Sequence, residues 1–436
     1  MTNVLYLPTR YFPSISGAEF YIQRIAEILT SKFNYNADIF TSNAVDFRAL
    51  RHPEGKIIEK TDPLFDRVNN LKINRFSITY NHSFEDILSE LKKLSFFNSI
   101  NITDNSVKKY LINGPYLKSL IEFFLRENVK NYDIIHTVFF PYFNIIISLI
   151  IGNFLNIPKI CTPFFHFSNP RYLDSNMVDI LKRFDTIIAC TQIEKKVLVN
   201  KFNLKAKKIA VVPMGVDIKR YNIKEIVKSN KAYFKEKFFA TNEKNYKLIL
   251  FCGHKNYEKG AISILKAIPY ILEKIKKVYF VFIGPSTKAF NYELSKILKN
   301  KNSRIINFSP DNLTGYYDNK KIAAFREADL YLMPSRSDAF GISFLEAWSA
   351  GKPVIGARIG ATPEVIRENV DGFLVEFDNP EDIAQKVIKL LKSKKLRKNL
   401  GTAGYLNVSQ KYRWELVAKK THLIYQNLIK NNLTKI

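Results

Sequence analysis

The chain has 436 residues, of which 46% are hydrophobic. Because this is enough to bury more than one core, about two or three domains are expected and a single domain is disfavoured. Lys and Arg number 67 against 40 Asp and Glu, a formal net charge of +27 that favours contact with an anionic partner. A nucleic acid, a membrane surface or a phosphorylated ligand would fit this charge, and so would a Lys-rich surface that is simply well solvated.

Cysteine usage and the N-terminal residues both favour a cytoplasmic protein. Cys161, Cys190 and Cys252 are odd in number and lie outside any metal-ligand spacing, as expected in a reducing compartment. The sequence MTNVLYLPTR lacks the basic start and the long apolar run of a secretory signal. We therefore expect a cytoplasmic location, with peripheral attachment to the inner face of the membrane left open.

One uncharged apolar segment, residues 134–158, is about long enough to span a bilayer. Pro141, Gly152 and three asparagines interrupt it, so its continuous apolar core is short. A strand followed by a buried helix is therefore predicted in preference to a membrane span.

The first half of the chain repeats a strand-then-helix pattern. Short apolar runs predict strands at residues 3–7, 37–41, 72–78, 133–137, 159–163, 185–190 and 208–213. Apolar residues at helical spacing predict helices at residues 18–31, 85–97, 114–127 and 192–201. Strands that alternate with helices form a parallel sheet covered on both faces.

The pattern is interrupted and then restarts. Residues 218–245 are Lys-rich and mostly polar, which marks them as a domain junction. Beyond them, strands are predicted at residues 246–253, 278–284, 304–308, 328–333 and 353–357. Helices are predicted at residues 260–276, 286–299, 319–327, 342–350 and 380–391, with an amphipathic tail helix at 405–433. The predicted fold class is α/β with two doubly wound domains, residues 1–217 and 218–404, and a C-terminal tail, 405–436, that packs back toward the first domain.

The chain is organised around the stretch at residues 335–364, SRSDAFGISFLEAWSAGKPVIGARIGATPE. Its first turn follows a predicted strand and precedes a predicted helix, which is where α/β sheets bind ligands. Asp338 and Glu346 flank a turn in which Gly341 lets the backbone approach a bound group. The unpaired amides of the following helix favour an anion. The alternative is an ordinary turn carboxylate and a solvated or capping glutamate.

A second motif, GHKNYEKG, lies at the end of an earlier predicted strand. Gly253 closes that strand, and Lys259 precedes Gly260 at the start of the next helix. An ammonium group beside a helix N-terminus suits phosphate oxygens. Taken alone, Lys259 is more often a surface lysine without a specific role.

Together these motifs resemble the retaining glycosyltransferases of family 4, which have the GT-B fold. The family's usual forms are G-R-x4-K-G, E-x-F-G-x4-E and G-G-x-P-E. The matching residues are Gly253, Lys259, Gly260, Phe340, Gly341, Glu346, Gly360, Pro363 and Glu364. The resemblance extends to VVPMGVD at residues 211–217, and in the first half it rests on Gly17 and His166. Asp338 replaces the family's Glu, His254 its Arg, Met214 its Asn and Ala361 the second Gly of the third motif.

The resemblance implies transfer of a sugar from a nucleotide-diphosphate sugar, which is a co-substrate, with retention of anomeric configuration and no metal or other cofactor. Glu346 would accept hydrogen bonds from the ribose hydroxyls. Lys259, assisted by His254, would hold the diphosphate together with backbone amides in the motif. Those amides belong to Phe340, Gly341 and Ile342.

The remaining implied roles concern the sugar and the approach of the backbone. Asp338 would bind a hydroxyl of the donor sugar, and His166 would approach that sugar from the first domain. Gly253 and Gly17 would allow close contact with the donor, and Asp338, Lys259 and His166 form the implied catalytic group. We expect Glu346→Ala and Lys259→Ala to abolish most transfer while leaving the melting of the fold intact.

The acceptor stays open between a glycan, a lipid-linked molecule and a small molecule, as in cell-envelope or polysaccharide biosynthesis. Residues 91–97 and 116–126 mix basic and aromatic side chains, which suits either an anionic membrane surface or two ordinary amphipathic helices. An epimerase or phosphorylase of similar architecture is an alternative enzyme. A nucleic-acid partner is not expected, because neither a helix-turn-helix signature nor a zinc finger is found. His136 and His422 are expected to be packed or solvated.

Overall fold

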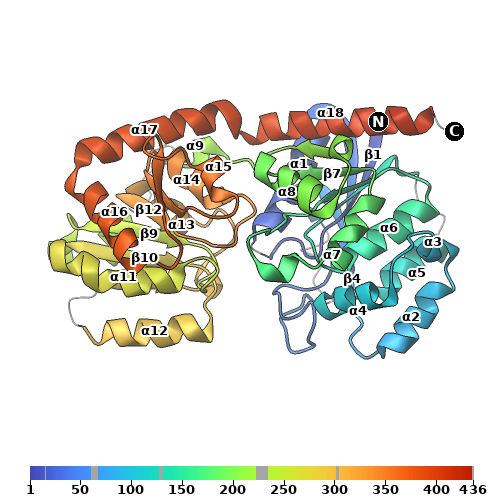
Figure 1. Ribbon diagram of the computed structural model, residues 1–436, viewed down its shortest axis with the longest axis horizontal. Coiled ribbons are helices and arrows are strands. Elements are labelled where there is room, and N and C mark those ends of the chain that lie inside the picture. The colour runs from blue at the N-terminus through green and yellow to red at the C-terminus, as the bar shows by residue number, and fades with distance from the viewer. Residues whose placement is uncertain (15, 60–66, 127–130, 222–233, 301–303, 435–436) are drawn as a thin grey trace. The chain divides into compact units, whose positions relative to one another are not determined.

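The computed structural model describes residues 1–14, 16–59, 67–126, 131–221, 234–300 and 304–434 (Figure 1). The chain divides into two compact units, Met1–Pro213 with Val417–Ile436, and Met214–Leu416. Part of the predicted junction, residues 222–233, lies outside the described residues. Short helices flank that part, α9 (Ile218–Tyr221) and α10 (Phe234–Phe238).

The first unit contains an eight-stranded sheet with the order β3-β4-β2-β1-β5-β6-β7-β8. Neighbouring strands are parallel except β3 and β4. All of the strands predicted in this half occur, and the two-residue β3 is too short to leave a sequence pattern. The strands are β1 (Thr2–Leu7), β2 (Tyr35–Ser42), β3 (Arg67–Val68), β4 (Leu71–Phe76), β5 (Ile134–Val138), β6 (Lys159–Thr162), β7 (Thr186–Ala189) and β8 (Ile209–Val211).

Helices cover this sheet, with two differences from the prediction. The single helix expected at 85–97 is two helices, because Leu94 adopts an extended backbone between them. Two helices, α4 and the four-residue α7, were not predicted, although the side chain of Thr103 caps α4 by accepting from the Ser106 amide. The helices are α1 (Gly17–Phe33), α2 (Phe84–Lys92), α3 (Ser95–Asn98), α4 (Asp104–Asn113), α5 (Lys118–Arg126), α6 (Asn144–Phe154), α7 (Ser175–Val178), α8 (Gln192–Phe202) and α18 (Trp414–Leu433).

The uncharged segment 134–158 forms the buried strand β5 and the buried helix α6, as predicted. The asparagine that starts α6 is used inside the protein, because Asn144 Nδ2 donates to the Leu7 carbonyl at 3.0 Å and to the Val138 carbonyl at 2.9 Å. These bonds satisfy a polar group that would be costly to bury alone. Among the described residues, no helix has the length and apolar character needed to cross a membrane.

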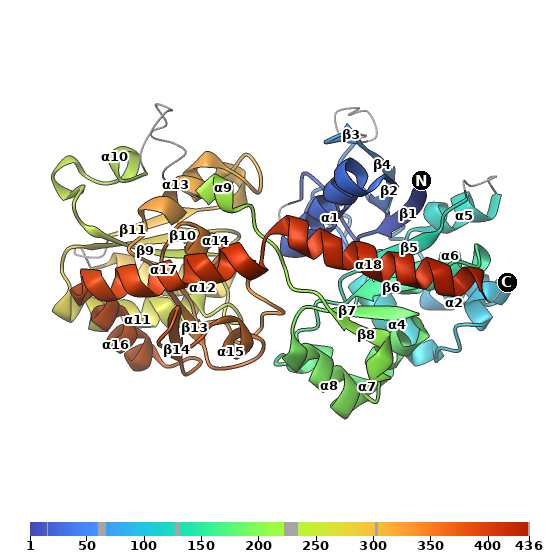
Figure 2. The same ribbon diagram turned by 90° about the horizontal axis from the view of Figure 1, so that it is seen from above.

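Helix α18 lies beside the first sheet (Figure 2). Polar side-chain contacts join the two. Its Tyr425 hydroxyl lies 2.5 Å from His136 Nδ1 on β5, and its His422 Nδ1 lies 2.8 Å from the Tyr35 hydroxyl on β2. His136 is fully buried, and burial lowers its pKa to about 3. Both histidines are therefore packed against aromatic neighbours, as expected.

The C-terminal region has two helices, α17 (Lys394–Lys411) and α18, where the sequence pattern favours one continuous helix over 405–433. Tertiary contacts explain the interruption. The carbonyl of Tyr412 accepts a hydrogen bond from the Val216 amide at 2.8 Å, and the Trp414 ring fills the space beside Gly215. No proline or glycine lies at this position, so the break between α17 and α18 could not be predicted from the sequence.

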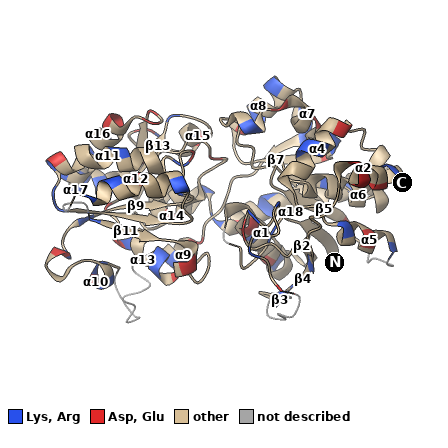
Figure 3. Cartoon of the chain, turned by 90° about the horizontal axis from the view of Figure 1, so that it is seen from below, with Lys and Arg blue, Asp and Glu red and all other residues tan. Residues whose placement is uncertain are grey.

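The second unit contains a parallel six-stranded sheet with the order β11-β10-β9-β12-β13-β14. Helices α11, α12 and α16 lie on one face and α9, α13 and α14 on the other, so the unit is doubly wound as predicted (Figure 3). Lys and Arg, blue in Figure 3, are spread over helices of both units. The strands are β9 (Lys247–Cys252), β10 (Val278–Ile283), β11 (Ile305–Phe308), β12 (Leu330–Met333), β13 (Val354–Ala357) and β14 (Gly372–Val375). The remaining helices are α11 (Ala261–Lys274), α12 (Lys288–Leu298), α13 (Asn319–Glu327), α14 (Ile342–Ser349), α15 (Thr362–Val365) and α16 (Pro380–Lys392).

Candidate active site

The predicted motifs of the second unit meet at the switch point of its sheet. The chain adds β10 and β11 on one side of β9, and β12 to β14 on the other side. Loops that leave neighbouring strands in opposite directions leave room for a ligand between them. The loop after β9 carries Gly253, His254 and Lys259, and the loop after β12 carries Asp338 and Gly341.

These two loops are held together backbone to backbone. The Glu258 carbonyl accepts hydrogen bonds from the Arg336 amide at 2.8 Å and from the Ser335 hydroxyl at 3.1 Å. Gly260, with φ 72°, lies so close to the second loop that a Cβ there would sit 2.2 Å from the Pro334 carbonyl oxygen. Glycine is required at this position by both its conformation and its neighbour.

Lys259 and Asp338 form an ion pair across the two loops. Lys259 Nζ lies 2.8 Å from Asp338 Oδ2 and donates a second hydrogen bond to the Ser337 carbonyl, also at 2.8 Å. The two side chains are 21% and 14% exposed, so solvent screens the pair only in part. The residues implied to hold the diphosphate and the sugar therefore neutralise each other.

Helix α14 begins next to this ion pair. Gly341 caps it in a left-handed conformation with φ 92°, and a Cβ there would meet the Phe344 ring at 2.6 Å. The amide of Phe340 donates a long hydrogen bond of 3.4 Å to Asp338 Oδ1. The start of α14, with Ile342 as its first residue, therefore directs its amides toward the same carboxyl edge.

His254 is a half-buried neutral histidine beside Lys259. Burial lowers its pKa, and the charges of Lys259 and Lys255 lower it further. Its Nδ1 atom is buried and has no hydrogen-bond partner among the described residues. A buried nitrogen without a partner is costly, which makes this atom a candidate for contact with a ligand.

Glu346 lies on α14 and is almost completely buried, with 2% of its side chain exposed. Its Oε1 atom accepts hydrogen bonds from the Tyr221 hydroxyl at 2.6 Å and from Lys321 Nζ at 2.8 Å. The sequence reasoning missed both partners, because they lie on α9 and α13 and no short-range pattern connects them to Glu346. This burial also revises the expectation that Glu346→Ala would leave melting intact, since Lys321 would lose its counter-charge.

Lys255 is a further residue that the sequence reasoning missed. It is fully buried, its ammonium donates to the Phe308 carbonyl at 2.9 Å and to the side chain of Asn307, and burial lowers its pKa to about 8. These bonds anchor the loop after β9 to β11. Lys255 therefore fixes the position of the neighbouring His254.

Two predicted site residues belong to the first unit. Gly17 is the first residue of α1, directly after Ser16 at the N-cap position. His166 follows β6 and is half-buried, with its ring centroid 4.9 Å from that of Tyr172. The other predicted site residues share the carboxyl edge of the second sheet. They are Gly253, His254, Lys259, Asp338, Phe340, Gly341, Ile342 and Glu346.

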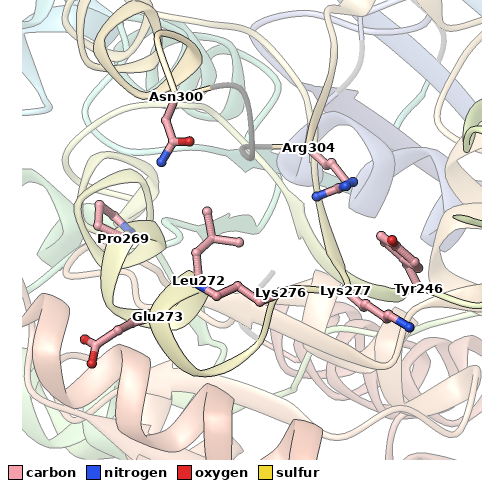
Figure 4. Close-up of a pocket in the computed structure, with 8 residues that line it drawn as sticks. All are labelled: Tyr246, Pro269, Leu272, Glu273, Lys276, Lys277, Asn300 and Arg304. Atoms are coloured by element: carbon pink, nitrogen blue, oxygen red, sulfur yellow. The ribbon is translucent and has the colours of Figure 1, made fainter.

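A pocket of about 520 Å³ lies elsewhere in the second unit (Figure 4). Tyr246, Lys277 and Arg304 directly precede β9, β10 and β11, so this pocket opens at the amino ends of the strands. It is separated from the candidate site by the length of the sheet. Its lining residues are Tyr246, Pro269, Leu272, Glu273, Lys276, Lys277, Asn300 and Arg304.

Metal-ligating side chains do not gather in the part of the chain that the structure describes. Within it, no group of three or more His, Cys, Asp or Glu residues is placed to hold a metal ion.

Two family models match the chain, one in each half. The model of the glycosyl transferases group 1 matches residues 233–407, and that of glycosyltransferase family 4 matches residues 96–220. An uncharacterized glycosyltransferase of Methanocaldococcus jannaschii is 28% identical over 373 residues, which cover 83% of this chain and 92% of the relative. These matches support a glycosyltransferase of the group 1, family 4 type.

Another relative matches a shorter part of the chain. The D-inositol 3-phosphate glycosyltransferase of Corynebacterium jeikeium is 27% identical over 259 residues, 57% of this chain and 59% of the relative. Among solved structures, HepE of Anabaena in complex with UDP and glucose superposes with a TM-score of 0.70 at 14% identity, covering 98% of this chain and 100% of HepE. A glycosyltransferase of Rickettsia africae superposes with a TM-score of 0.68 at 18% identity, covering 99% of each chain. The fold is therefore GT-B, with two Rossmann-like parallel sheets and a C-terminal helix, as predicted.

Proposed function

We propose that the chain transfers a sugar from a nucleotide-diphosphate sugar to an acceptor, with retention of anomeric configuration and without a metal ion. The observation that carries the proposal is the switch point of the second sheet, where Lys259, His254 and Asp338 meet the start of α14. These groups have the charge and hydrogen-bonding capacity that a sugar diphosphate needs. The complexes of HepE with UDP and with UDP-glucose support a donor of this class.

Glu346 is the proposed ribose anchor. Tyr221 and Lys321 both bond to Oε1 and hold the carboxylate in one orientation before a ligand arrives. Its other oxygen would then accept hydrogen bonds from the ribose hydroxyls. Because the group is already fixed, little conformational entropy would be lost on binding.

Lys259 and His254 are the proposed diphosphate ligands. A diphosphate carries more negative charge than one carboxylate, so it would draw the Lys259 ammonium away from Asp338. The released Asp338 carboxylate would then accept a hydrogen bond from a hydroxyl of the donor sugar. Lys259 and the amides at the start of α14 would stabilise the charge that develops on the leaving diphosphate as the glycosidic bond breaks.

The acceptor oxygen would attack on the face from which the diphosphate departs, which retains the anomeric configuration, and an oxygen of the departing phosphate would take the acceptor's proton. His166 would approach the sugar from the first unit, and Gly17 would let the start of α1 come close to a phosphate or to the acceptor. These two roles rest on the resemblance to the family.

A thermal-shift screen of common nucleotide sugars tests the donor, because a ligand that binds only the folded protein raises its melting temperature. The expected result is stabilisation by one nucleotide sugar and by its nucleoside diphosphate. Incubation with that donor, with and without a sugar acceptor, separates transfer from epimerisation or phosphorolysis, and NMR of the product reports the anomeric configuration. Stabilisation by none of the donors would overturn the proposal.

We also propose that any contact with an anionic membrane is electrostatic. Three apolar residues of the two basic-aromatic segments face the core, since Leu91, Phe97 and Phe124 are at most 4% exposed. Lys92 and Lys93 beside them are exposed and would be attracted to anionic lipid. Flotation with phosphatidylglycerol vesicles should show binding at low salt that disappears at high salt, and no binding at low salt would remove the idea.

A further inference from the structure

The carboxyl edge of the first sheet carries an aromatic cluster, made of Phe47, Phe139 and Tyr142. The ring centroids of Phe139 and Tyr142 are 4.7 Å apart, and those of Phe47 and Phe139 are 5.9 Å apart. Phe47 and Phe139 are half-buried, so the cluster reaches the surface. Phe139 has a left-handed backbone with φ 78°, a conformation that is unusual for a bulky residue and that concentrates at ligand sites.

A buried arginine lies under this cluster but is already neutralised. The Arg10 guanidinium lies 3.7 Å from the Phe47 ring centroid, and its Nη2 atom is 2.8 Å from Glu19. Arg10 is 3% exposed and Glu19 is 2% exposed, so the pair is internal to the fold. Arg10 therefore supports the aromatic cluster and does not supply charge at the surface.

Two exposed arginines, Arg51 and Arg171, come to the same edge from distant parts of the chain. The Arg171 guanidinium donates to the Asn113 side chain. The next residue, Gly114, packs so closely on the segment before Arg51 that a Cβ would lie 1.8 Å from the Leu50 carbonyl oxygen. Asn113 and Gly114 thus bring the two arginines to one rim.

Both arginines act on the aromatic cluster through Tyr142. Burial raises the pKa of Tyr142, and the positive charges of Arg10, Arg171 and Arg51 oppose that rise. The placement of the two arginines follows from contacts, because a Cβ added at Gly114 would lie 3.6 Å from Arg51 Cγ and the preceding Asn113 holds the Arg171 guanidinium.

Neither exposed arginine forms an ion pair with a carboxylate of the described residues. Arg48, three residues from Arg51 on the same loop, does pair with Glu54. The contrast shows that this loop can neutralise an arginine, yet Arg51 has no carboxylate partner among the residues that the structure describes. Two like charges gathered at one place without a counter-charge favour an anionic ligand, and the guanidinium fork suits phosphate and carboxylate oxygens.

We propose that this edge of the first unit binds an acceptor that carries a phosphate or carboxylate group. Arg51 and Arg171 hold the anionic group, and the half-buried faces of Phe47 and Phe139 contact the ring or apolar part of the acceptor. The inference rests on the proposed function only in calling the ligand an acceptor. A soluble sugar phosphate, a uronic acid and a lipid phosphate share the required chemistry.

The test is calorimetric titration of the full chain with glucose 6-phosphate, glucuronate and dodecyl phosphate, using neutral glucose as the reference. The variants are Arg51→Gln, Arg171→Gln and the double variant, with Arg48→Gln as the matched exposed control. We expect at least one anionic probe to bind more tightly than glucose, and the double variant to weaken that binding by about tenfold or more. Arg171→Lys should restore part of the loss by keeping the charge without the fork.

The anionic probe that binds most tightly identifies whether the acceptor is a sugar phosphate, a uronic acid or a lipid phosphate. Equal binding of glucose and of the anionic probes, equal binding by the double variant and the wild type, or no binding of any probe would overturn the inference. These measurements need no donor turnover. If the chain binds the anionic probe through its arginines but transfers no sugar, the acceptor site stands and the proposed reaction is wrong. If it turns over a donor but does not bind the probes, the proposed reaction stands and the acceptor site is wrong.

Discussion

The carboxyl edges of the two sheets handle charge in opposite ways. At the edge of the second sheet, Lys259 pairs with Asp338, and Lys321 pairs with Glu346, both at 2.8 Å. At the edge of the first sheet, Arg51 and Arg171 are exposed and lack a carboxylate partner among the described residues. The first edge also contains the buried Arg10–Glu19 pair, so the difference lies in its two exposed arginines.

The two edges would therefore bind an anionic ligand in different ways. At the edge of the second sheet, each paired side chain must leave its partner when an anionic ligand binds. Selectivity among ligands therefore depends on the new partner that the ligand offers each side chain. An edge with two unpaired guanidinium groups attracts any small anion and selects among them by its aromatic surroundings.

The largest effect is expected from Glu346→Ala. Transfer should fall by about 100-fold or more, because the ribose anchor is lost. The free energy of unfolding should fall by about 3–5 kcal/mol, because the buried Lys321 is left unpaired. Kinetics and urea denaturation measure the two losses.

A second variant separates the two effects of that change. Glu346→Ala combined with Lys321→Met removes both buried charges and should recover part of the stability without recovering transfer. Full turnover by Glu346→Ala would contradict the assignment of Glu346 to the donor.

Lys259→Ala should lower kcat/KM by about 100-fold, because the diphosphate loses its main cation. The part-buried position of the pair predicts only a small change in melting temperature. The matched variant is Lys259→Ala with Asp338→Asn, which removes both charges of the ion pair. Recovery of donor binding in the double variant would show that Lys259 serves only to neutralise Asp338.

Two glycines of the first motif should respond differently to alanine. Gly260→Ala places a Cβ 2.2 Å from the Pro334 carbonyl at a φ of 72°, so the free energy of unfolding should fall by about 1–3 kcal/mol. At Gly253 the nearest atom to an added Cβ is 3.6 Å away, so stability should change by less than about 0.5 kcal/mol. Donor affinity should nevertheless fall in Gly253→Ala, and unchanged affinity there would mean that no ligand approaches this backbone.

The smallest effect concerns His254 and pH. The lowered pKa of His254 keeps the ring neutral near pH 7. A bound diphosphate favours the protonated ring, so donor affinity should rise as pH falls, by at most about tenfold per pH unit. His254→Arg carries a permanent charge and should flatten this dependence while preserving or raising activity. A severe loss in His254→Arg would show that the neutral ring has a role of its own.

The lowered pKa of His254 also makes the free energy of unfolding depend on pH. The unfolded chain binds a proton at the ordinary pKa of histidine, and the folded chain binds it only at a lower pH. Stability from this group is therefore complete above the ordinary pKa and is lost as pH falls toward the lowered one. His254→Arg should remove that part of the pH dependence of urea denaturation.

Local patterns predicted much of the fold. Helix α13 was predicted at 319–327 and is observed at Asn319–Glu327, because its spacing and its capping residue Asp318 lie within one short window. Helix α4 was missed although Thr103 gives it an N-cap, since its apolar positions are few. The break between α17 and α18 had no sequence signal at all, because the Val216 amide and Gly215 impose it from far away in the chain.

The sequence by itself determined the alternation of strands and helices and the chemical identity of the motif residues, because side-chain periodicity and turn chemistry act over a few neighbouring positions. The tertiary structure alone decided which charges meet. It paired Lys259 with Asp338 and buried Glu346 between Tyr221 and Lys321. It left Arg51 and Arg171 on one rim, without a carboxylate partner in the part of the chain that the structure describes. These contacts join residues that only the closure of long loops brings together, and no short window of sequence encodes such a pairing.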